Sequence, residues 1–62
     1  MQVLKEDIRG RILTVARQQF ERKGYSKTSM REIAELAGVG VGNIYNYFTN
    51  KDELFHEVVR PV

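Results

Sequence analysis

The sequence predicts a small all-α domain of three helices and the start of a fourth, linking helix, and three observations favour this fold class. Apolar residues recur at helical spacing in several segments, capping residues precede two of these segments, and no alternating pattern of the kind typical of strands is found. The composition, 42% hydrophobic and 29% charged residues, is typical of one folded domain, assigned to residues 1–62. Residues 1–6 are expected to form a disordered tail.

The first predicted helix begins near Glu6 or Asp7 and ends at Gly24. Acidic residues suit its start, and Arg22 and Lys23 suit its end, because these charges complement the helix dipole. Its apolar residues share one face when plotted at about 100° per residue. They are Ile8, Ile12, Leu13, Val15, Ala16 and Phe20.

The second predicted helix begins after Ser29, because Ser29 and Glu32 have the S-x-x-E spacing of a capping box. In this motif the Ser29 hydroxyl accepts a hydrogen bond from the Glu32 amide, and the Glu32 carboxylate reaches back to the cap. Gly38 is expected to end the helix, since glycine tolerates the left-handed conformation of a helix C-terminus. The inward residues of the helix are Met30, Ile33, Ala34 and Ala37.

The third predicted helix covers residues 41–48, where Ile44, Tyr47 and Phe48 recur at positions i, i+3 and i+4. Asn50 and the Glu three residues later repeat the capping logic, so a fourth helix begins after Asn50 and ends before the proline near the C-terminus. Its apolar face consists of Leu54, Phe55, Val58 and Val59.

Gly38, Gly40 and Gly42 either bind a phosphate or join two helices. A nucleotide-binding loop requires a preceding strand and the spacing G-x-G-x-x-G or G-x-x-x-x-G-K-[ST], and this sequence has neither. The glycines instead favour a helix-turn-helix whose third helix enters the major groove of DNA. Gly42 costs about 1 kcal/mol relative to alanine inside a helix. It therefore indicates a close approach of another surface, which is either a nucleic acid or the first helix.

Charge and composition narrow the class of function. Residues 1–31 carry eight Lys or Arg against three acids, giving +5, whereas residues 32–62 carry two against five, giving −3. The difference favours a basic face for a polyanion, with an ordinary solvated face as the alternative. With no cysteine and one histidine, neither a metal site nor a cofactor is expected. No apolar run approaches the roughly 18 residues of a membrane span, so we expect a cytoplasmic protein with no membrane partner.

Residues in fixed register over about 9–58 resemble the N-terminal DNA-binding domain of the TetR-type transcriptional regulators. They are Arg11-Ile12-Leu13, Ala16, Phe20, Gly24-Tyr25, Thr28-Ser29-Met30, Ile33-Ala34, Ala37-Gly38-Val39, Gly42-Asn43-Ile44-Tyr45, Tyr47-Phe48, Lys51 and Leu54. The resemblance implies a homodimeric regulator, usually a repressor, that binds double-stranded DNA at a palindromic operator. It also implies a C-terminal domain that dimerises and binds a small-molecule effector, and we expect that domain to lie outside these 62 residues.

The resemblance also implies the DNA-binding residues. They are Thr28, Ser29, Arg31, Gly40, Val41, Gly42, Asn43, Tyr45, Asn46, Tyr47 and Lys51. Thr28 and Ser29 would place hydroxyls and helix N-terminal amides against a phosphate, with simple capping as the alternative. Arg31 would contact a phosphate or guanine, or remain solvated. Lys51 begins the fourth helix, where a positive charge is unfavourable unless an anion lies nearby.

In the third helix, Asn43 or Asn46 would bond to adenine, and Val41 would pack on a thymine methyl group. Tyr45 and Tyr47 would present hydroxyls to phosphates while their rings pack locally, with pure core packing as the alternative. Two positions depart from the family pattern. Gly40 stands where the family commonly has Ser, and Tyr47 stands where it often has His.

The main alternative function is a small helical module that binds a partner protein through exposed Tyr45, Tyr47 and Phe48. This alternative predicts binding that barely depends on salt. An enzyme is not expected, and no catalytic residue is assigned, because the acidic residues serve as caps and solvated faces and no nucleophile–base pair is visible. His56 is interpreted as solvated or packed.

Overall fold

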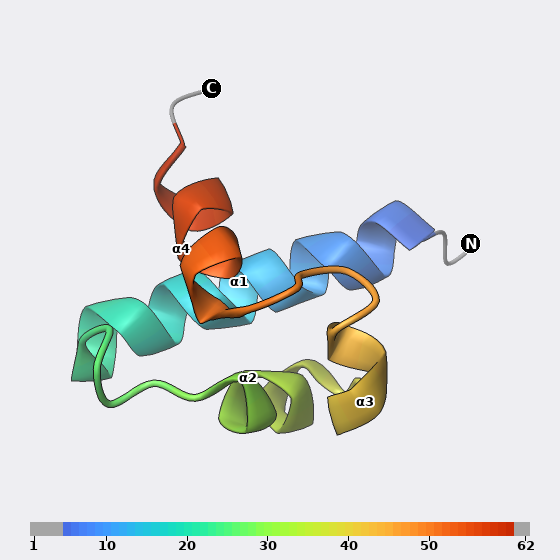
Figure 1. The fold of residues 1–62 in the computed structure, drawn as a ribbon, viewed down its shortest axis with the longest axis horizontal. Coiled ribbons are helices and arrows are strands. Elements are labelled where there is room, and N and C mark those ends of the chain that lie inside the picture. The colour runs from blue at the N-terminus through green and yellow to red at the C-terminus, as the bar shows by residue number, and fades with distance from the viewer. Residues whose placement is uncertain (1–4, 61–62) are drawn as a thin grey trace.

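The structure, a computed structural model, describes residues 5–60, which form four helices and no strand. The helices are α1 (Lys5–Lys23), α2 (Met30–Ala37), α3 (Val41–Ile44) and α4 (Lys51–Val59). α2 and α3 lie together along one side of the long α1, while α4 crosses α1 and its C-terminal end points away from α2 and α3 (Figure 1). The predicted all-α fold is confirmed.

The core lies where α1 meets the other helices. The side chains of Ile12, Ile33, Ile44 and Leu54, one from each helix, are fully buried. Burying a side chain of this size contributes about 1.5–3 kcal/mol relative to leaving it exposed. The remaining buried core residues are Ala16, Phe20, Met30, Ala34, Ala37 and Phe48. The predicted inward faces are therefore correct, except that Val59 of α4 is 57% exposed.

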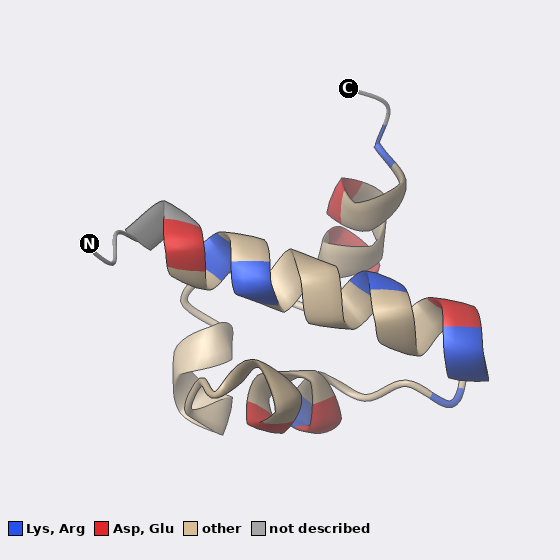
Figure 2. Ribbon diagram, turned by 180° about the vertical axis from the view of Figure 1, so that it is seen from behind, with Lys and Arg blue, Asp and Glu red and all other residues tan. Residues whose placement is uncertain are grey.

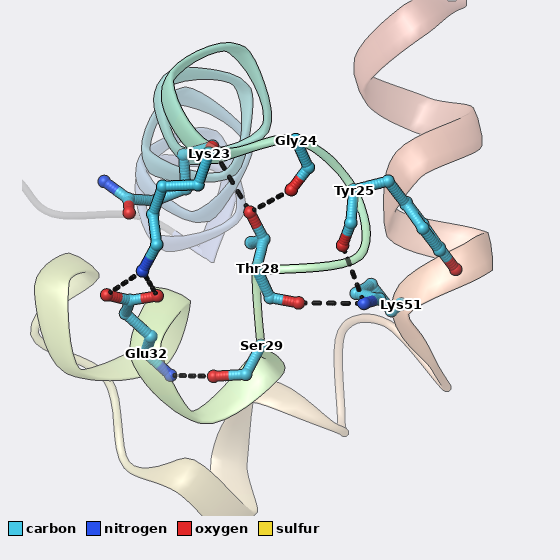
Figure 3. A network of polar contacts seen from close by, with 8 residues as sticks. Lys23, Gly24, Tyr25, Thr28, Ser29, Glu32 and Lys51 are labelled. Atoms are coloured by element: carbon cyan, nitrogen blue, oxygen red, sulfur yellow. Dashed lines mark hydrogen bonds and ion pairs between the residues drawn. The ribbon is translucent and has the colours of Figure 1, made fainter.

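The cap of α2 is only half of the predicted capping box. Ser29 accepts a hydrogen bond from the Glu32 amide at 3.1 Å, as predicted. The Glu32 carboxylate does not reach back to the cap but binds the ammonium of Lys23 at 2.5 and 2.7 Å (Figure 3). A cation is a stronger partner for a carboxylate than a neutral amide is. This contact ties the end of α1 to the first turn of α2.

The cap of α4 is formed by the side chains of Asn50 and Glu53. The Asn50 side chain accepts a hydrogen bond from the Glu53 amide at 2.8 Å. The Glu53 carboxylate reaches back one residue beyond the cap and accepts a hydrogen bond from the Thr49 amide at 2.6 Å. The predicted start of α4 is confirmed.

Gly38 ends α2 in the left-handed conformation, with φ 74° and ψ 32°. Its amide donates to carbonyl oxygens of α2, and the Val39 amide donates to the Ala34 carbonyl oxygen at 2.8 Å. From α1, Arg11 Nε donates to the Ala37 carbonyl oxygen at 3.1 Å. The turn between α2 and α3 is therefore fixed both by glycine and by a contact from α1.

The predicted extent of the third helix is wrong. α3 ends at Ile44 rather than at residue 48, and residues 45–47 form a turn. In this turn the Asn46 and Tyr47 amides donate to carbonyl oxygens three residues back, at 2.9 and 3.0 Å. Gly42 and the two asparagines are poor helix formers, which accounts for the short helix. α1 begins at Lys5, next to its predicted start near Glu6 or Asp7, so residues 5 and 6 of the predicted tail are helical. Residues 1–4 lie outside the described residues.

No helix within residues 5–60 combines the length and the apolar character that crossing a membrane requires. Over the same part of the chain, no group of three or more His, Cys, Asp or Glu residues is arranged to hold a metal ion.

Candidate nucleic-acid interface

Thr28 precedes the cap of α2, but its side chain is buried, with 1% of its surface exposed. Its hydroxyl oxygen lies 2.8 Å from the Gly24 carbonyl oxygen (Figure 3). It also lies 3.2 Å from the Gln19 carbonyl oxygen. Gln19 lies in the last turns of α1, and Gly24 directly follows the helix. The Thr28 hydroxyl thus joins the end of α1 to the start of α2 within the chain, and a contact between Thr28 and a phosphate stays a prediction.

Lys51 finds its partners within the chain. Its Nζ donates to the Tyr25 and Thr28 carbonyl oxygens at 2.8 and 2.9 Å and lies 4.2 Å from the centre of the Tyr25 ring (Figure 3). The carbonyl oxygens supply the negative partner that a lysine at a helix N-terminus needs, so an external anion is not required to explain it. An ammonium has three N–H donors, and these two bonds leave one of them for a further acceptor.

Asp52 adds a second link between α4 and the connection that follows α1. The Tyr25 hydroxyl donates to Asp52 Oδ1, and this hydrogen bond raises the pKa of Tyr25 above its ordinary value of 10.0 because it favours the neutral phenol. The Tyr25 ring also packs edge-on against Phe55 and stacks with Phe20, with ring centres 5.2 and 5.7 Å apart. The connection between α1 and α2 is thus held against α4.

A shallow hollow opens beside this network. It is bordered by the N-terminus of α2, the turn after α3 and the start of α4, and it is lined by Ser26, Thr28, Ser29, Met30, Arg31, Tyr45, Asn50 and Lys51. The hollow gathers predicted site residues from three separate segments of the chain. Ser26 and Asn50 were not among the predicted site residues, although Asn50 directly precedes Lys51 in the sequence.

Ser29 and Arg31 are among the exposed residues that line this hollow. The Ser29 oxygen accepts the capping hydrogen bond, which leaves its hydroxyl proton to donate elsewhere. Arg31 lies 3.9 Å from Glu35, and the two side chains are 77% and 65% exposed. An ion pair this exposed contributes little to stability, so the Arg31 guanidinium is available to another acceptor.

α3 places its buried face, Ile44, in the core and leaves its remaining residues exposed. Val41 is 37% exposed and the following Tyr45 is 49% exposed. Asn46 Nδ2 donates to Asn43 Oδ1 at 2.8 Å, so the two amides meet on the surface. No Lys, Arg, Asp or Glu occurs in α3, as the tan ribbon in Figure 2 shows.

The glycines of this region have open surroundings. A Cβ atom added at Gly42 would meet no atom within 4 Å, so the alternative that Gly42 packs closely against α1 is wrong. Gly40 caps α3 without a side-chain hydrogen bond, and a Cβ there would meet only Asn43 Cβ, at 3.8 Å. Nothing within the described part of the chain therefore requires glycine at residue 42.

The aromatic residues after α3 are divided between surface and core. Tyr47 is half-buried and packs against the core, in agreement with the predicted local packing of its ring. Phe48 is 1% exposed. The alternative surface for a partner protein therefore loses Phe48, and Tyr45 is its one largely exposed aromatic residue.

Ion pairs offset part of the charge difference between the two halves of the chain. Arg9 binds Glu57 at 2.9 Å and Lys23 binds Glu32 at 2.5 Å, so bases of the first half pair with acids of the second. On the side seen in Figure 2, basic and acidic residues are interspersed. The predicted basic face is thus partly neutralised within the fold.

Comparison with known proteins gives consistent matches. Residues 12–58 match the family model described as bacterial regulatory proteins, tetR family. Over 47 residues the chain is 49% identical to an uncharacterized HTH-type transcriptional regulator, YhgD of Bacillus subtilis strain 168, covering 76% of this chain and 25% of YhgD. It is 45% identical to the HTH-type transcriptional regulator AcrR of Shigella flexneri, covering 86% of this chain and 25% of AcrR.

A named repressor and a solved structure extend these matches. The chain is 36% identical to the HTH-type transcriptional repressor KstR2 of Mycobacterium tuberculosis strain H37Rv, covering 84% of this chain and 26% of the repressor. The crystal structure of a mutant HlyIIR protein superposes with a TM-score of 0.86 at 38% identity, covering 90% of this chain and 32% of the HlyIIR chain. The chain thus spans about a quarter to a third of the length of these proteins.

Proposed function

The chain belongs to the tetR family of bacterial regulatory proteins, and we propose that it binds double-stranded DNA with α3 in the major groove and the start of α2 against the phosphate backbone. One observation carries this proposal. The hollow between α2 and α4 gathers hydrogen-bond donors beside the exposed, uncharged surface of α3. Donors for phosphates thus adjoin side chains suited to base edges, as DNA recognition requires.

Phosphates are proposed to bind at the hollow. Ser29 contributes its hydroxyl proton, and the first turn of α2 contributes backbone amides. Arg31 contributes a weakly paired guanidinium, and Lys51 contributes its third N–H donor. Tyr45 contributes an exposed hydroxyl, whereas half-buried Tyr47 contributes its hydroxyl from a ring packed on the core.

Bases are proposed to be read by Val41, Asn43 and Asn46. An asparagine amide matches the edge of adenine, and valine provides an apolar contact for a thymine methyl group. Gly40 and Gly42 have no side chain to keep the backbone of α3 away from the DNA. The open space around the absent Cβ of Gly42 supports this role.

In the regulator to which this domain would belong, we propose a homodimer that recognises a palindromic operator and represses transcription. The half-sites would lie about one helical turn, or a multiple of it, apart. A small-molecule effector would act through a C-terminal domain, and the 62-residue domain by itself would bind a half-site weakly. Its relatives are named transcriptional regulators, which supports a non-enzymatic role in the cytoplasm, where bacterial DNA lies.

The test is an amide NMR titration of the ¹⁵N-labelled 62-residue chain with a short mixed-sequence DNA duplex at low salt. We expect shifts at residues 29–31, 40–47 and 51 that fade as salt rises, because phosphate binding releases counterions. Exposed Arg17 and Gln18 of α1 serve as internal controls. Shifts spread evenly over every cationic residue, or none near α3, would contradict the proposed interface. Titration with heparin separates a general response to polyanions from recognition of duplex DNA.

A further inference from the structure

We propose that Asn43 and Asn46 read two neighbouring base pairs as one hydrogen-bonded unit rather than as two separate contacts. The inference rests on the proposed function and adds to it the hydrogen-bonding groups of DNA that this surface selects.

The two residues are joined twice. Asn46 Nδ2 donates to Asn43 Oδ1 at 2.8 Å, and the Asn46 backbone amide donates to the Asn43 carbonyl oxygen at 2.9 Å. Both side chains are exposed, while Ile44 between them is fully buried and anchors the segment in the core. The amide pair is thus held in place before any ligand arrives, which lowers the entropy lost on binding.

The internal hydrogen bond makes the two amides unequal. A side-chain amide has two N–H donors and one oxygen acceptor, and this bond occupies one donor of Asn46 and a lone pair of the Asn43 oxygen. Asn43 keeps both donors and therefore matches acceptors such as purine N7, guanine O6 or thymine O4. Asn46 keeps one donor and a free oxygen, which match N7 and N6 of adenine.

The spacing of the pair fits adjacent base pairs. Asn43 lies in α3 and Asn46 in the turn that follows it, and their side-chain amides meet at 2.8 Å. Successive nucleotides of one strand are separated by about 3.4 Å along the DNA axis. The unit therefore selects an adenine next to a guanine, whose N7 and O6 offer two acceptors to the two free donors of Asn43. Among residues 41–46, Tyr45 is the one other polar side chain. The two asparagines are therefore the side-chain amides that this segment offers to base edges.

The experiment begins by selecting preferred duplexes from a randomised pool with the 62-residue chain. The affinities of the parent, Asn43→Ala, Asn46→Ala and the double variant are then measured on the preferred duplex and on duplexes changed at one base pair. Gln18→Ala removes an exposed amide from α1 and is the matched control. Amide spectra verify that each variant is folded.

We expect each single variant to lose about tenfold in affinity for the preferred duplex, in line with the value of a good base contact. The double variant should also lose about tenfold, because loss of either amide disrupts the unit, whereas independent contacts would together lose about a hundredfold. Both single variants should relax the sequence preference at the same two adjacent base pairs. Gln18→Ala should change neither the affinity nor the sequence preference.

A hundredfold loss in the double variant would overturn the inference, as would preferences that relax at separate base pairs or do not relax at all. A role confined to folding would leave the ratio between the preferred and changed duplexes unaltered, and this outcome would overturn it too. Failure of the parent chain to bind any duplex would overturn the proposed function itself, which distinguishes the two failures.

Discussion

Lys51 Nζ donates to the Thr28 carbonyl oxygen at 2.9 Å, so the first residue of α4 holds the residue that precedes the cap of α2. The same ammonium binds the Tyr25 carbonyl oxygen and packs on the Tyr25 ring. One side chain therefore supports the connection between α1 and α2 and also brings a positive charge to the hollow at the proposed interface.

Lys51→Ala should lower both stability and DNA binding. Loss of the charged donor to two carbonyl oxygens is expected to lower the free energy of unfolding by about 1–2 kcal/mol. Binding should weaken about equally for all sequences, and the slope of log K against log salt should fall by about one, because one phosphate contact is lost. Urea unfolding and salt-dependent binding measure the two effects, with exposed Lys27→Ala as the control for stability. If the slope of log K against log salt did not change, Lys51 would have a structural role only.

Gly42→Ala should separate folding from DNA binding. No atom lies within 4 Å of the added Cβ, so the folded domain accommodates it. Replacing a helical glycine by alanine is expected to raise the free energy of unfolding by about 0.5–1 kcal/mol. DNA affinity should fall about tenfold or more, because the methyl group meets the DNA. Gly10→Ala in α1, where the Cβ also meets nothing within 4 Å, should stabilise without weakening DNA binding. Equal DNA affinities for both variants would show that no DNA surface approaches Gly42.

Gly38→Ala should destabilise the domain, although there is room for the side chain. Gly38 has φ 74°, and the nearest atom to an added Cβ is Arg11 Nη2 at 4.0 Å. A non-glycine residue in the left-handed conformation costs about 1–2 kcal/mol, and asparagine tolerates it better than alanine. Thermal or urea unfolding should therefore rank the parent above Gly38→Asn, and Gly38→Asn above Gly38→Ala. An alanine variant as stable as the parent would refute a conformational requirement for glycine.

The Arg9–Glu57 contact should make stability depend on pH. The hydrogen bond from Arg9 holds the pKa of Glu57 below its ordinary value of 4.5. Because the folded pKa is lowered, this contribution is fully present above the unfolded pKa and is lost as pH falls through the lower folded pKa. Melting temperatures of the parent and Glu57→Gln should therefore differ at about pH 6 and converge as the pH falls well below 4.5.

Glu35→Gln is the control for this titration, since Glu35 forms a long, exposed contact with Arg31. Its melting temperature should follow that of the parent at every pH. If Glu57→Gln did so as well, Glu57 would not contribute to the acid dependence of stability.

The sequence by itself determined the helix order, the caps at Ser29 and Asn50, and the end of α2 at Gly38. These features depend on groups within a few residues of one another, so local spacing is enough to reveal them. The apolar faces of the helices were also readable, because helical periodicity fixes which residues point inward. The family resemblance added the position of the proposed interface.

Only the tertiary structure decided how particular polar groups are used. It buried Thr28, gave Glu32 a partner in Lys23, and directed Lys51 to carbonyl oxygens 23 and 26 residues earlier in the chain. It also ended α3 at Ile44. A turn over residues 45–47, rather than a longer helix, brings Phe48 into the core. Each of these outcomes depends on competition between local partners and distant ones, and that competition is settled only when the helices pack.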